Sequence, residues 1–322
     1  MGKGLYAGVD LGGTSMMAVI ASGSGTVLGE STTATDRSTW KTTVGQVIEQ
    51  IELAAKDAGI KPSKIDAIGV GAPGATDPKT GMVYRAPNLG WTRVPLGQLL
   101  NDRFRAPVAI GNDVQVAIVG EHAFGAAKGK KRVVGVWVGT GVGGGLIVDG
   151  VLDRGFRGAA GELGHMVLDE NGPQCPCGRK GCVEAFASRT SMEREVFALI
   201  RAGRKSVIPA IMKEREKTRM TSSVMQRALE AKDPVMTEVL AKAQHYLGLL
   251  AGNIVNFYDP EAIVIGGGVA QRLKEAFVGP IRKVARPRFL KPDTKGEISI
   301  THATLGDYSG ALGASVLAKR KK

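Results

Sequence analysis

The chain has 322 residues, 43% of them hydrophobic, which is enough for two domains with sizeable cores. Its net charge of +13 favours phosphate-bearing partners, although no aromatic residues are interleaved with the basic ones as a surface for single-stranded nucleic acid requires. We recognise neither a signal peptide nor an apolar run long enough to span a membrane, so we expect a soluble protein of the cytoplasm.

The first part of the chain predicts a meander of three strands. Residues 5–10 and 16–21 have the apolar character and length of strands and are separated by a glycine turn; a third strand is expected near 26–30. A strand that returns directly after a tight turn indicates a hairpin, not the strand–helix–strand unit that opens a dinucleotide-binding domain.

The first glycine turn carries the first chemical signal. Gly12 and Gly13 allow backbone N–H groups to approach a phosphate, and Thr14 and Ser15 add hydroxyl donors. Asp10, at the end of the preceding strand, could hold a magnesium ion through water. An ordinary Gly-Gly hairpin would have the same sequence, so the turn alone leaves both interpretations open.

The following segment alternates helices and strands. These elements are a helix over 44–58, a strand over 67–71 with a loop at 72–75, a strand over 107–110 and a helix over 114–124. Asn112 and Asp113 stand where the last strand meets the last helix. A carboxylate there can point into a cleft and accept the proton of a substrate hydroxyl as its oxygen attacks a γ-phosphate. Asn and Asp are also favoured helix N-caps, so a structural role is the alternative.

The strand–turn–strand pattern then occurs a second time. A strand is expected over 133–138, a glycine turn over 139–145 and a returning strand over 146–149, which indicates a distant internal duplication. The turn has G-x-G-x-x-G spacing, but a dinucleotide fingerprint needs a helix after it, and a strand follows here. A third turn, 266–268, joins a strand over 261–266 to a helix. Three such turns predict a nucleotide held in a cleft between two lobes.

The cysteines form a compact motif. Cys175, Cys177 and Cys182 are the only cysteines, and His165 stands ten residues before the first of them. Three thiolates and an imidazole are the four ligands of a closed tetrahedral zinc site, although three inert buried cysteines would be the alternative. Glu162 and Glu184 flank the motif, so a folded zinc loop would line a polar pocket. Together with Asn88 and the Asn112-Asp113 pair, these acids offer the hydrogen-bond partners that a polyol needs.

The rest of the chain is less specific. Segment 188–257 is expected to be mostly helical with a basic loop over 204–222, followed by a strand over 297–300 and a closing helix over 309–318 that packs on the first half of the chain. Basic residues cluster at 128–132, 201–205, 213–219 and 319–322. Each cluster taken singly is best interpreted as solvated surface.

Together the motifs resemble the ROK family (repressors, open reading frames and kinases), and within it the bacterial glucokinase type. The motifs that carry this resemblance span nearly the whole chain. They lie at 10–14, 72–74, 88–91, 112–113, 138–144, 162–165, 175–184 and 266–269. The resemblance implies an α/β actin-like ATPase fold, a duplicated ribonuclease-H-like fold of two lobes with an interlobe cleft. Residues 1–117 and 306–322 would form the small lobe, and 118–305 the large lobe with the zinc loop and a helical insertion.

The resemblance also implies ATP-dependent phosphorylation of the 6-hydroxyl of a hexose, glucose first. Asp113 would be the catalytic base. The implied sugar-binding residues are Gly74, Asn88, Asn112, Asp113, Glu162, His165 and Glu184. Asn112 and Asp113 would hold the 3- and 4-hydroxyl side of the ring, and the two glutamates with the histidine the 1- and 2-hydroxyl side.

The cofactor positions follow from the same resemblance. Asp10 would serve Mg²⁺. Phosphates of ATP would contact Gly12, Gly13, Thr14, Ser15, Thr140 and Gly141, and the adenosine side Gly267 and Gly268. A structural zinc ion would be held by His165, Cys175, Cys177 and Cys182, with the second ring nitrogen of the histidine turned to the sugar.

Several alternatives stay open. Ser15 and the segment 307–310 depart from the common family pattern, and with the basic clusters they keep inorganic polyphosphate as a possible donor. The acceptor could instead be N-acetylmannosamine, fructose or another hexose. A sugar-responsive regulator of the same family would need an N-terminal helix-turn-helix, for which a first strand near residue 5 leaves no room, so nucleic acid is not the expected partner. The family implies a homo-oligomer, a dimer or a tetramer.

Overall fold

The computed structural model describes residues 4–321, so the predictions that concern the first three residues, and Lys322 of the basic tail, lie outside it. The chain divides into two compact units: residues 1–129, 155–158 and 304–322 form the first, and residues 130–154 and 159–303 the second. No helix within residues 4–321 combines the length and apolar character needed to cross a membrane.

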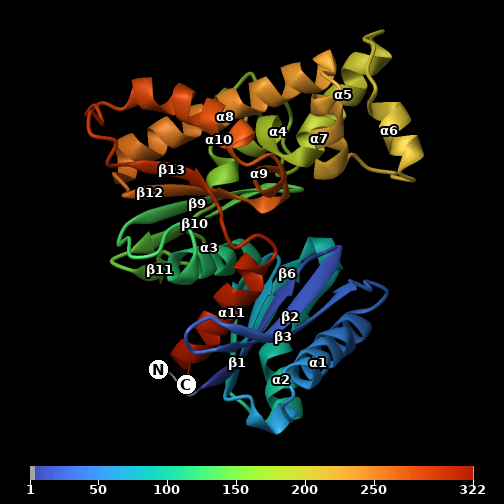
Figure 1. The fold of residues 1–322 in the computed structure, drawn as a ribbon, viewed down its shortest axis with the longest axis vertical. Helices are drawn as coiled ribbons and strands as arrows, with labels where there is room; N and C mark the ends of the chain where they lie inside the picture. The colour runs from blue at the N-terminus through green and yellow to red at the C-terminus, as the bar shows by residue number, and fades with distance from the viewer. Residues whose placement is uncertain (1–3, 322) are drawn as a thin grey trace. The chain divides into compact units, whose positions relative to one another are not determined.

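The first unit is built on a mixed five-stranded sheet (Figure 1). Its strands are β1 (Leu5–Leu11), β2 (Ser15–Ser22), β3 (Val27–Ala34), β4 (Ala67–Ala72) and β8 (Val108–Asn112), in the order β3-β2-β1-β4-β8. The first three strands are antiparallel, as the predicted meander requires, while β4 and β8 run parallel to β1. The carboxyl ends of β1, β4 and β8 therefore lie at one edge of this sheet.

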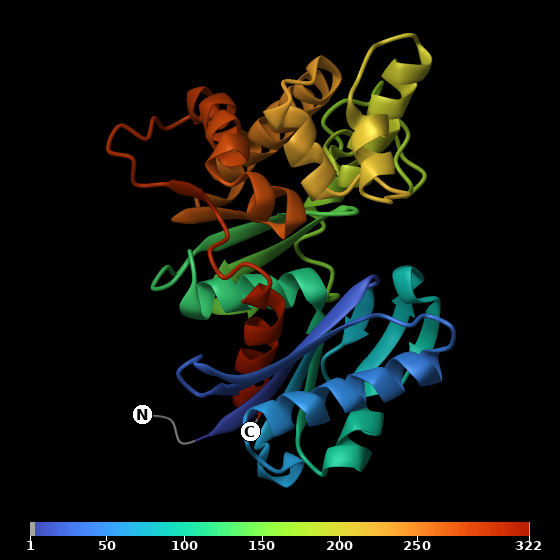
Figure 2. The same ribbon diagram turned by 45° about the vertical axis from the view of Figure 1, so that its right-hand side comes forward.

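Helices cover both faces of this sheet (Figure 2). Successive residues of its central strand, β1, point to opposite faces, so each face has apolar contacts for a helix. Val9 and its apolar neighbours cluster with α1 (Trp40–Asp57), whereas the backbone of Gly8 lies against Ala311 of α11 (Tyr308–Lys321). The closing helix thus packs on the first half of the chain, as predicted. It also packs against α3 (Asp113–Phe124), which lies wholly in the first unit although a boundary at residue 117 would divide it.

A second, small sheet in this unit was not predicted. Its antiparallel strands are β5 (Ala75–Asp77), β6 (Met82–Ala86) and β7 (Trp91–Val94). The short helix η2 (Pro87–Leu89) joins the last two strands and carries Asn88. Helix α2 (Leu96–Phe104) follows, and η1 (Pro62–Lys64) precedes β4. The strands are too short and too polar to show a clear period in the sequence.

The second unit repeats the main sheet of the first. Its strands are β9 (Val133–Val138), β10 (Val142–Val148), β11 (Val151–Asp153), β12 (Ala262–Gly266) and β13 (Ser299–His302), in the order β11-β10-β9-β12-β13. Again three antiparallel strands are extended by two that run parallel to the first of them. The internal duplication predicted from the two hairpins is confirmed.

The glycine run after β9 corrects one prediction. Strand β10 begins at Val142, so Gly143, Gly144 and Gly145 lie in the strand and not in the turn. A Cβ on Gly144 would come within 2.5 Å of the carbonyl oxygen of Gly161, which shows how closely the segment before η3 (Leu163–His165) approaches β10. These glycines therefore bring the segment that carries His165 directly against the sheet.

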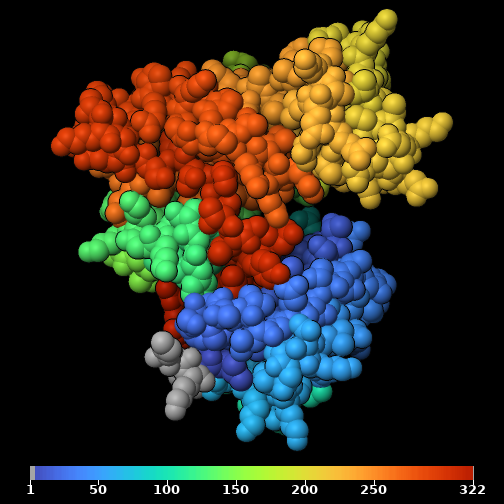
Figure 3. All heavy atoms as spheres, viewed as in Figure 1, coloured from blue at the N-terminus to red at the C-terminus, as the bar shows by residue number. Residues whose placement is uncertain are grey.

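Helices complete the second unit. They are α4 (Val183–Ala187), α5 (Arg189–Arg201), α6 (Ile208–Glu214), α7 (Ser222–Glu230), α8 (Pro234–Tyr258), α9 (Gly267–Leu273), α10 (Glu275–Ala285) and the short η4 (Arg286–Arg288). Helix α6 lies inside the predicted basic loop 204–222, because Ile208 and Met212 give it a buried face. The segment that contains these basic residues lies at the surface (yellow in Figure 3).

Candidate active site and metal centre

Three predicted sugar-side residues of the first unit lie at the carboxyl edge of its sheet. Gly74 follows β4, and Asn112 ends β8. The side-chain amide of Asn112 donates to the carbonyl oxygen of Gly74 at 3.2 Å, so the two loops are held together. Asn88 lies beside the first glycine turn, since a Cβ on Gly13 would be 3.2 Å from that of Asn88.

Asn112 and Asp113 have different local roles. The side-chain oxygen of Asn112 accepts hydrogen bonds from the backbone N–H groups of Val114 (3.0 Å) and Gln115 (3.2 Å), so the capping role weighed for this pair belongs to Asn112. Asp113 is the first residue of α3 and is half-buried, and one of its oxygens accepts from the N–H of Val114 at 2.9 Å. A carboxylate at a helix N-terminus interacts favourably with the helix dipole.

Asp10 lies in a crowded acidic environment. Burial first, and then the negative charges of Asp113 and Asp307, together raise the pKa of Asp10 from 3.8 to about 7. Gly310 leaves room for the carboxylate, because a Cβ there would be 2.3 Å from Asp10 Oδ2. Grouped carboxylate oxygens are the ligands that Mg²⁺ prefers, so this part of the unit fits a hard cation. The contribution of Asp307 to this environment was not predicted from the sequence.

The first glycine turn is partly closed on itself. The N–H of Gly12 donates to the carbonyl oxygen of Ser15 at 3.0 Å, which uses one of the predicted phosphate donors within the turn. The N–H groups of Gly13 and Thr14 have no acceptor among residues 4–321, and the side chains of Thr14 and Ser15 are exposed. The turn thus keeps backbone and hydroxyl donors at the surface.

The second and third glycine turns are neighbours in the second unit. They follow β9 and β12, which are adjacent parallel strands, so both turns lie at one edge of the sheet. The N–H of Gly139 donates to the carbonyl oxygen of Gly141 at 2.9 Å, which leaves the side chain of Thr140 exposed at the tip. A Cβ on Gly267 would lie 2.5 Å from the carbonyl oxygen of Val138, so the two turns are in close contact.

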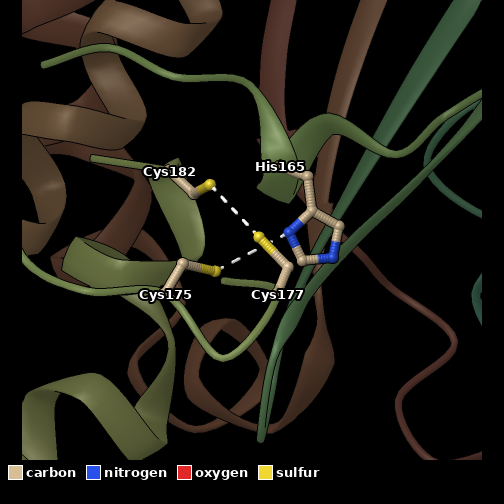
Figure 4. A group of neighbouring side chains, drawn as sticks. All are labelled: His165, Cys175, Cys177 and Cys182. Carbon is tan, nitrogen blue, oxygen red and sulfur yellow. Dashed lines mark hydrogen bonds between the residues drawn. The ribbon is translucent and has the colours of Figure 1, made fainter. Parts of the chain in front are cut away.

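The four predicted zinc ligands converge (Figure 4). Their donor atoms all lie within 4.8 Å of one another. Sγ of Cys177 is 3.7 Å from Sγ of Cys182, and Sγ of Cys175 is 3.8 Å from Nδ1 of His165. Two sulfurs on one tetrahedral zinc ion, each bound at about 2.3 Å, would be about 3.8 Å apart. The side chains therefore fit a single tetrahedral ion, and the Nε2 atom of His165 points away from the sulfurs.

The cysteine thiols have dissimilar acidities. Burial raises the pKa of the Cys175 thiol to about 12 and also raises that of Cys182. The backbone N–H of Arg179, and then its guanidinium, lower the pKa of the exposed Cys177 to about 6. Because a closed metal site uses thiolates, the ion itself must supply the positive charge that stabilises the two buried sulfurs in that form.

Glu184 links the cysteine motif to the second glycine turn. Its Oε2 atom accepts a hydrogen bond of 2.9 Å from the N–H of Val142, while Oε1 lies 3.9 Å from Sγ of Cys175. Gly141 lies directly beside this carboxylate, since a Cβ there would be 2.4 Å from Oε2. The structure therefore brings His165 and Glu184 together around Cys175. Glu162 is exposed just before η3, and among the described residues its side chain forms no hydrogen bond to either of them.

One cation of this region was not foreseen. Arg189, the first residue of α5, is half-buried and donates to the hydroxyl oxygen of Thr140 at 3.1 Å. Its position in the sequence, between a helix cap and an ordinary helical segment, carries no signal of this contact. Only the folded chain brings it beside the turn.

The two units contain the same strand meander, and in each unit two parallel strands extend it. Glycine turns follow the central strands at their carboxyl ends. This arrangement is the actin-like ATPase fold. Within this class, residues 6–321 match the profile of the ROK family, and the chain belongs to that family.

Both kinases and regulators are among its relatives. The glucokinase of Halalkalibacterium halodurans is 32% identical over 320 residues, which cover 98% of this chain and 96% of that protein. The crystal structure of a ROK family glucokinase from Streptomyces griseus in complex with glucose and AMPPNP has a TM-score of 0.85 at 30% identity and covers 98% of this chain and 100% of that chain. The xylose repressor of Caldicellulosiruptor bescii is 33% identical over 242 residues, 75% of this chain and 60% of the repressor.

Proposed function

We propose that the protein is a hexose kinase of the glucokinase type, which transfers the γ-phosphoryl group of ATP to the 6-hydroxyl of glucose. The observation that carries this proposal is the carboxylate of Asp113, which begins α3 at the same edge of the sheet as the first glycine turn. It is supported by the glucokinase of H. halodurans, which matches nearly the full length of both chains.

In the proposed reaction, Asp113 accepts the proton of the sugar 6-hydroxyl while the oxygen attacks the γ-phosphorus, and ADP leaves. Asn88, Asn112 and the backbone at Gly74 would orient hydroxyls of the sugar. Glu162, His165 and Glu184 would bind others, with Nε2 of His165 available for a hydroxyl because Nδ1 faces the cysteines. Restricting the sugar in this way aligns its hydroxyl with the phosphoryl group.

The donor would be bound through backbone and hydroxyl groups of the glycine turns. Gly12, Gly13, Thr14, Ser15, Thr140 and Gly141 would contact phosphates, and Gly267 and Gly268 the adenosine side. Mg²⁺, held through Asp10, would neutralise charge on the phosphates. The AMPPNP complex of the S. griseus glucokinase supports ATP as the donor.

The metal centre would be structural. We propose zinc, because the donor set of His165, Cys175, Cys177 and Cys182 fits four-coordinate zinc and leaves no position for substrate. Bound zinc would fix the tautomer and direction of His165, so the sugar-facing nitrogen would be set by the metal. Thiols that bind a metal fit a reducing compartment such as the cytoplasm.

A coupled kinase assay tests the proposal most economically. Purified protein is offered ATP and Mg²⁺ with a panel of glucose, mannose, fructose, N-acetylglucosamine and N-acetylmannosamine, and formation of ADP is followed. We expect glucose to give the highest kcat/KM. A preference for N-acetylmannosamine or fructose would keep the kinase proposal and change its substrate, whereas turnover of none of these sugars would overturn it.

A regulatory function is the second candidate, because the xylose repressor of C. bescii is 33% identical over 242 residues of the chain. The chain spans 60% of that repressor's length. A gel-shift assay at physiological salt, with and without sugar, distinguishes the candidates, since a regulator binds a specific duplex more tightly than random DNA. We expect no sequence-specific shift.

A further inference from the structure

Arg189 is fixed to the tip of the second glycine turn by two contacts. Its backbone N–H donates to the carbonyl oxygen of Gly139 at 2.8 Å, and its guanidinium donates to the hydroxyl oxygen of Thr140 at 3.1 Å. The residue begins α5 directly after Ser188, whose hydroxyl caps that helix. The guanidinium is thus held beside the turn by the helix that carries it.

No acidic side chain in the described part of the chain forms an ion pair with Arg189. Glu193 stands one helical turn further on, but it is buried and both of its oxygens are occupied. One accepts hydrogen bonds from the guanidinium of Arg219 (2.9 and 2.7 Å), and the other from the N–H of Met220 at 2.8 Å. Arg189 forms no ion pair within residues 4–321.

The surroundings make an unmatched cation costly. Burial lowers the pKa of the Arg189 guanidinium; the charge of Glu193 opposes this effect and that of Arg219 adds to it. A guanidinium has five N–H donors, and within residues 4–321 that of Arg189 donates a single hydrogen bond, to the neutral hydroxyl of Thr140. A half-buried cation with spare donors and a second cation nearby is suited to bind an anion.

The position of Arg189 indicates which anion. The hydroxyl of Thr140 lies at the tip of the turn after β9, and the adjacent turn after β12 contacts it through Gly267 and Val138. Gly268 in turn lies beside Ser222, since a Cβ there would be 3.3 Å from the Ser222 hydroxyl. Arg189 is therefore on the Thr140 side of the two turns, the side to which the proposed function assigns phosphates.

We propose that Arg189 binds a non-bridging oxygen of the β- or γ-phosphate of the phosphoryl donor. This inference rests on the proposed function only in taking Thr140 and Gly141 as a phosphate-binding turn. The planar guanidinium can meet two phosphate oxygens at once, which a lysine cannot do. The same chemistry serves a nucleotide and a chain of inorganic phosphate, so both belong in the test.

The test is a calorimetric binding titration of ADP, AMP and tripolyphosphate to wild type, Arg189→Met and Arg189→Lys. Arg201→Met is the matched control, because Arg201 lies in the same helix and is exposed. This substitution removes the same charge. We expect Arg189→Met to weaken ADP and tripolyphosphate about 10- to 100-fold, since hydrogen bonds to charged groups are among the strong ones. Arg189→Lys should recover part of this loss. AMP should change less than about threefold, and Arg201→Met should bind all three as wild type does.

Wild-type affinity of Arg189→Met for both ADP and tripolyphosphate would overturn the inference. A loss for AMP as large as that for ADP would also overturn it, because it would place Arg189 on the nucleoside side or in a purely structural role. If wild type binds ADP in an Arg189-dependent way but phosphorylates no sugar, the proposed function fails and this inference stands. If wild type binds none of the three compounds, both fail.

Discussion

The Oε2 atom of Glu184 accepts a hydrogen bond of 2.9 Å from the backbone N–H of Val142, the first residue of β10. This contact joins a carboxylate proposed to bind sugar to the strand that leaves the second glycine turn. The other oxygen of Glu184 lies 3.9 Å from Sγ of Cys175. Any displacement of the cysteine motif should therefore move Glu184 and, through it, the turn.

Metal removal tests this linkage. We expect elemental analysis of the purified protein to give about one zinc ion per chain, and His165→Ala or Cys175→Ser to lose most of it. Loss of metal should lower Tm and raise the KM for sugar, because Glu184 and His165 lose their fixed positions. His245→Ala, which alters an exposed histidine, is the control and should keep the metal. Full zinc content in the His165 variant would contradict the assignment.

The pH dependence of stability tests the environment of Asp10. The pKa of Asp10 is raised from 3.8 to about 7, so the folded protein holds this proton over a range in which the unfolded chain releases it. The contribution of Asp10 is therefore most favourable at and below about pH 4 and is lost as the pH rises to about 7. Asp10→Asn cannot ionise, so without Mg²⁺ its Tm should exceed that of wild type by a margin that increases from pH 4 to pH 8.

Asp102→Asn is the control for this series, because Asp102 is exposed on α2. Its Tm should differ from that of wild type by a constant amount across the same pH range. A margin for Asp10→Asn that is flat, or that shrinks as the pH rises, would show that the carboxyl is not held in its protonated form.

Glu121 should be essential to the stability of the first unit. Its fully buried carboxylate accepts hydrogen bonds from the N–H groups of Ala126, Thr304 and Leu305 and from the hydroxyl of Ser309. Glu121→Leu would leave these donors buried without an acceptor, at a cost of about 3–5 kcal/mol in the free energy of unfolding. Denaturant titration measures it, and Glu49→Leu on the exposed side of α1 should cost less than about 0.5 kcal/mol.

Close helix packing gives a paired prediction for two glycines. A Cβ on Gly313 of α11 would be 1.8 Å from the carbonyl oxygen of Val116 in α3, whereas a Cβ on Gly45 of α1 meets nothing within 4 Å. We expect Gly313→Ala to destabilise by about 1–3 kcal/mol. Gly45→Ala should instead stabilise the protein by about 0.5–1 kcal/mol. Gly45 lies on the exposed side of a helix that accepts alanine, and alanine lowers the conformational entropy of the unfolded chain. Equal effects in a thermal-denaturation measurement would contradict the packing of α3 against α11.

Local patterns were sufficient to predict much of the fold. Apolar periodicity indicated the long helix α1 and the strands β1, β4 and β9, and the turns after β1 and β9 revealed the duplication. The cysteine motif could also be predicted as a metal site, because the spacing of its ligands is a local property of the sequence. Asp113 could be chosen as a candidate catalytic base because it stands at a strand–helix junction.

Features that depend on contacts between residues distant in the sequence could not be predicted from the sequence. Gly143 to Gly145 resembled a turn, but they lie in β10 because the segment around Gly161 must approach that strand closely. Arg189 and Asp307 join their sites only through folding, which brings Arg189 beside Thr140 and Asp307 near Asp10. Helix α6 was not predicted, because basic residues surround its few apolar side chains in the sequence, which are buried in the structure.

The most direct test of the account compares wild type with Asp113→Asn in a coupled assay of glucose 6-phosphate formation. The wild type should phosphorylate glucose with ATP. The variant should lose about 10²–10⁴-fold in kcat, because an amide cannot accept the proton of the sugar hydroxyl. Its metal content and its affinity for ADP should stay at wild-type values, which separates a chemical defect from misfolding. Turnover in Asp113→Asn equal to that of wild type, or no glucose phosphorylation by wild type, would contradict the account.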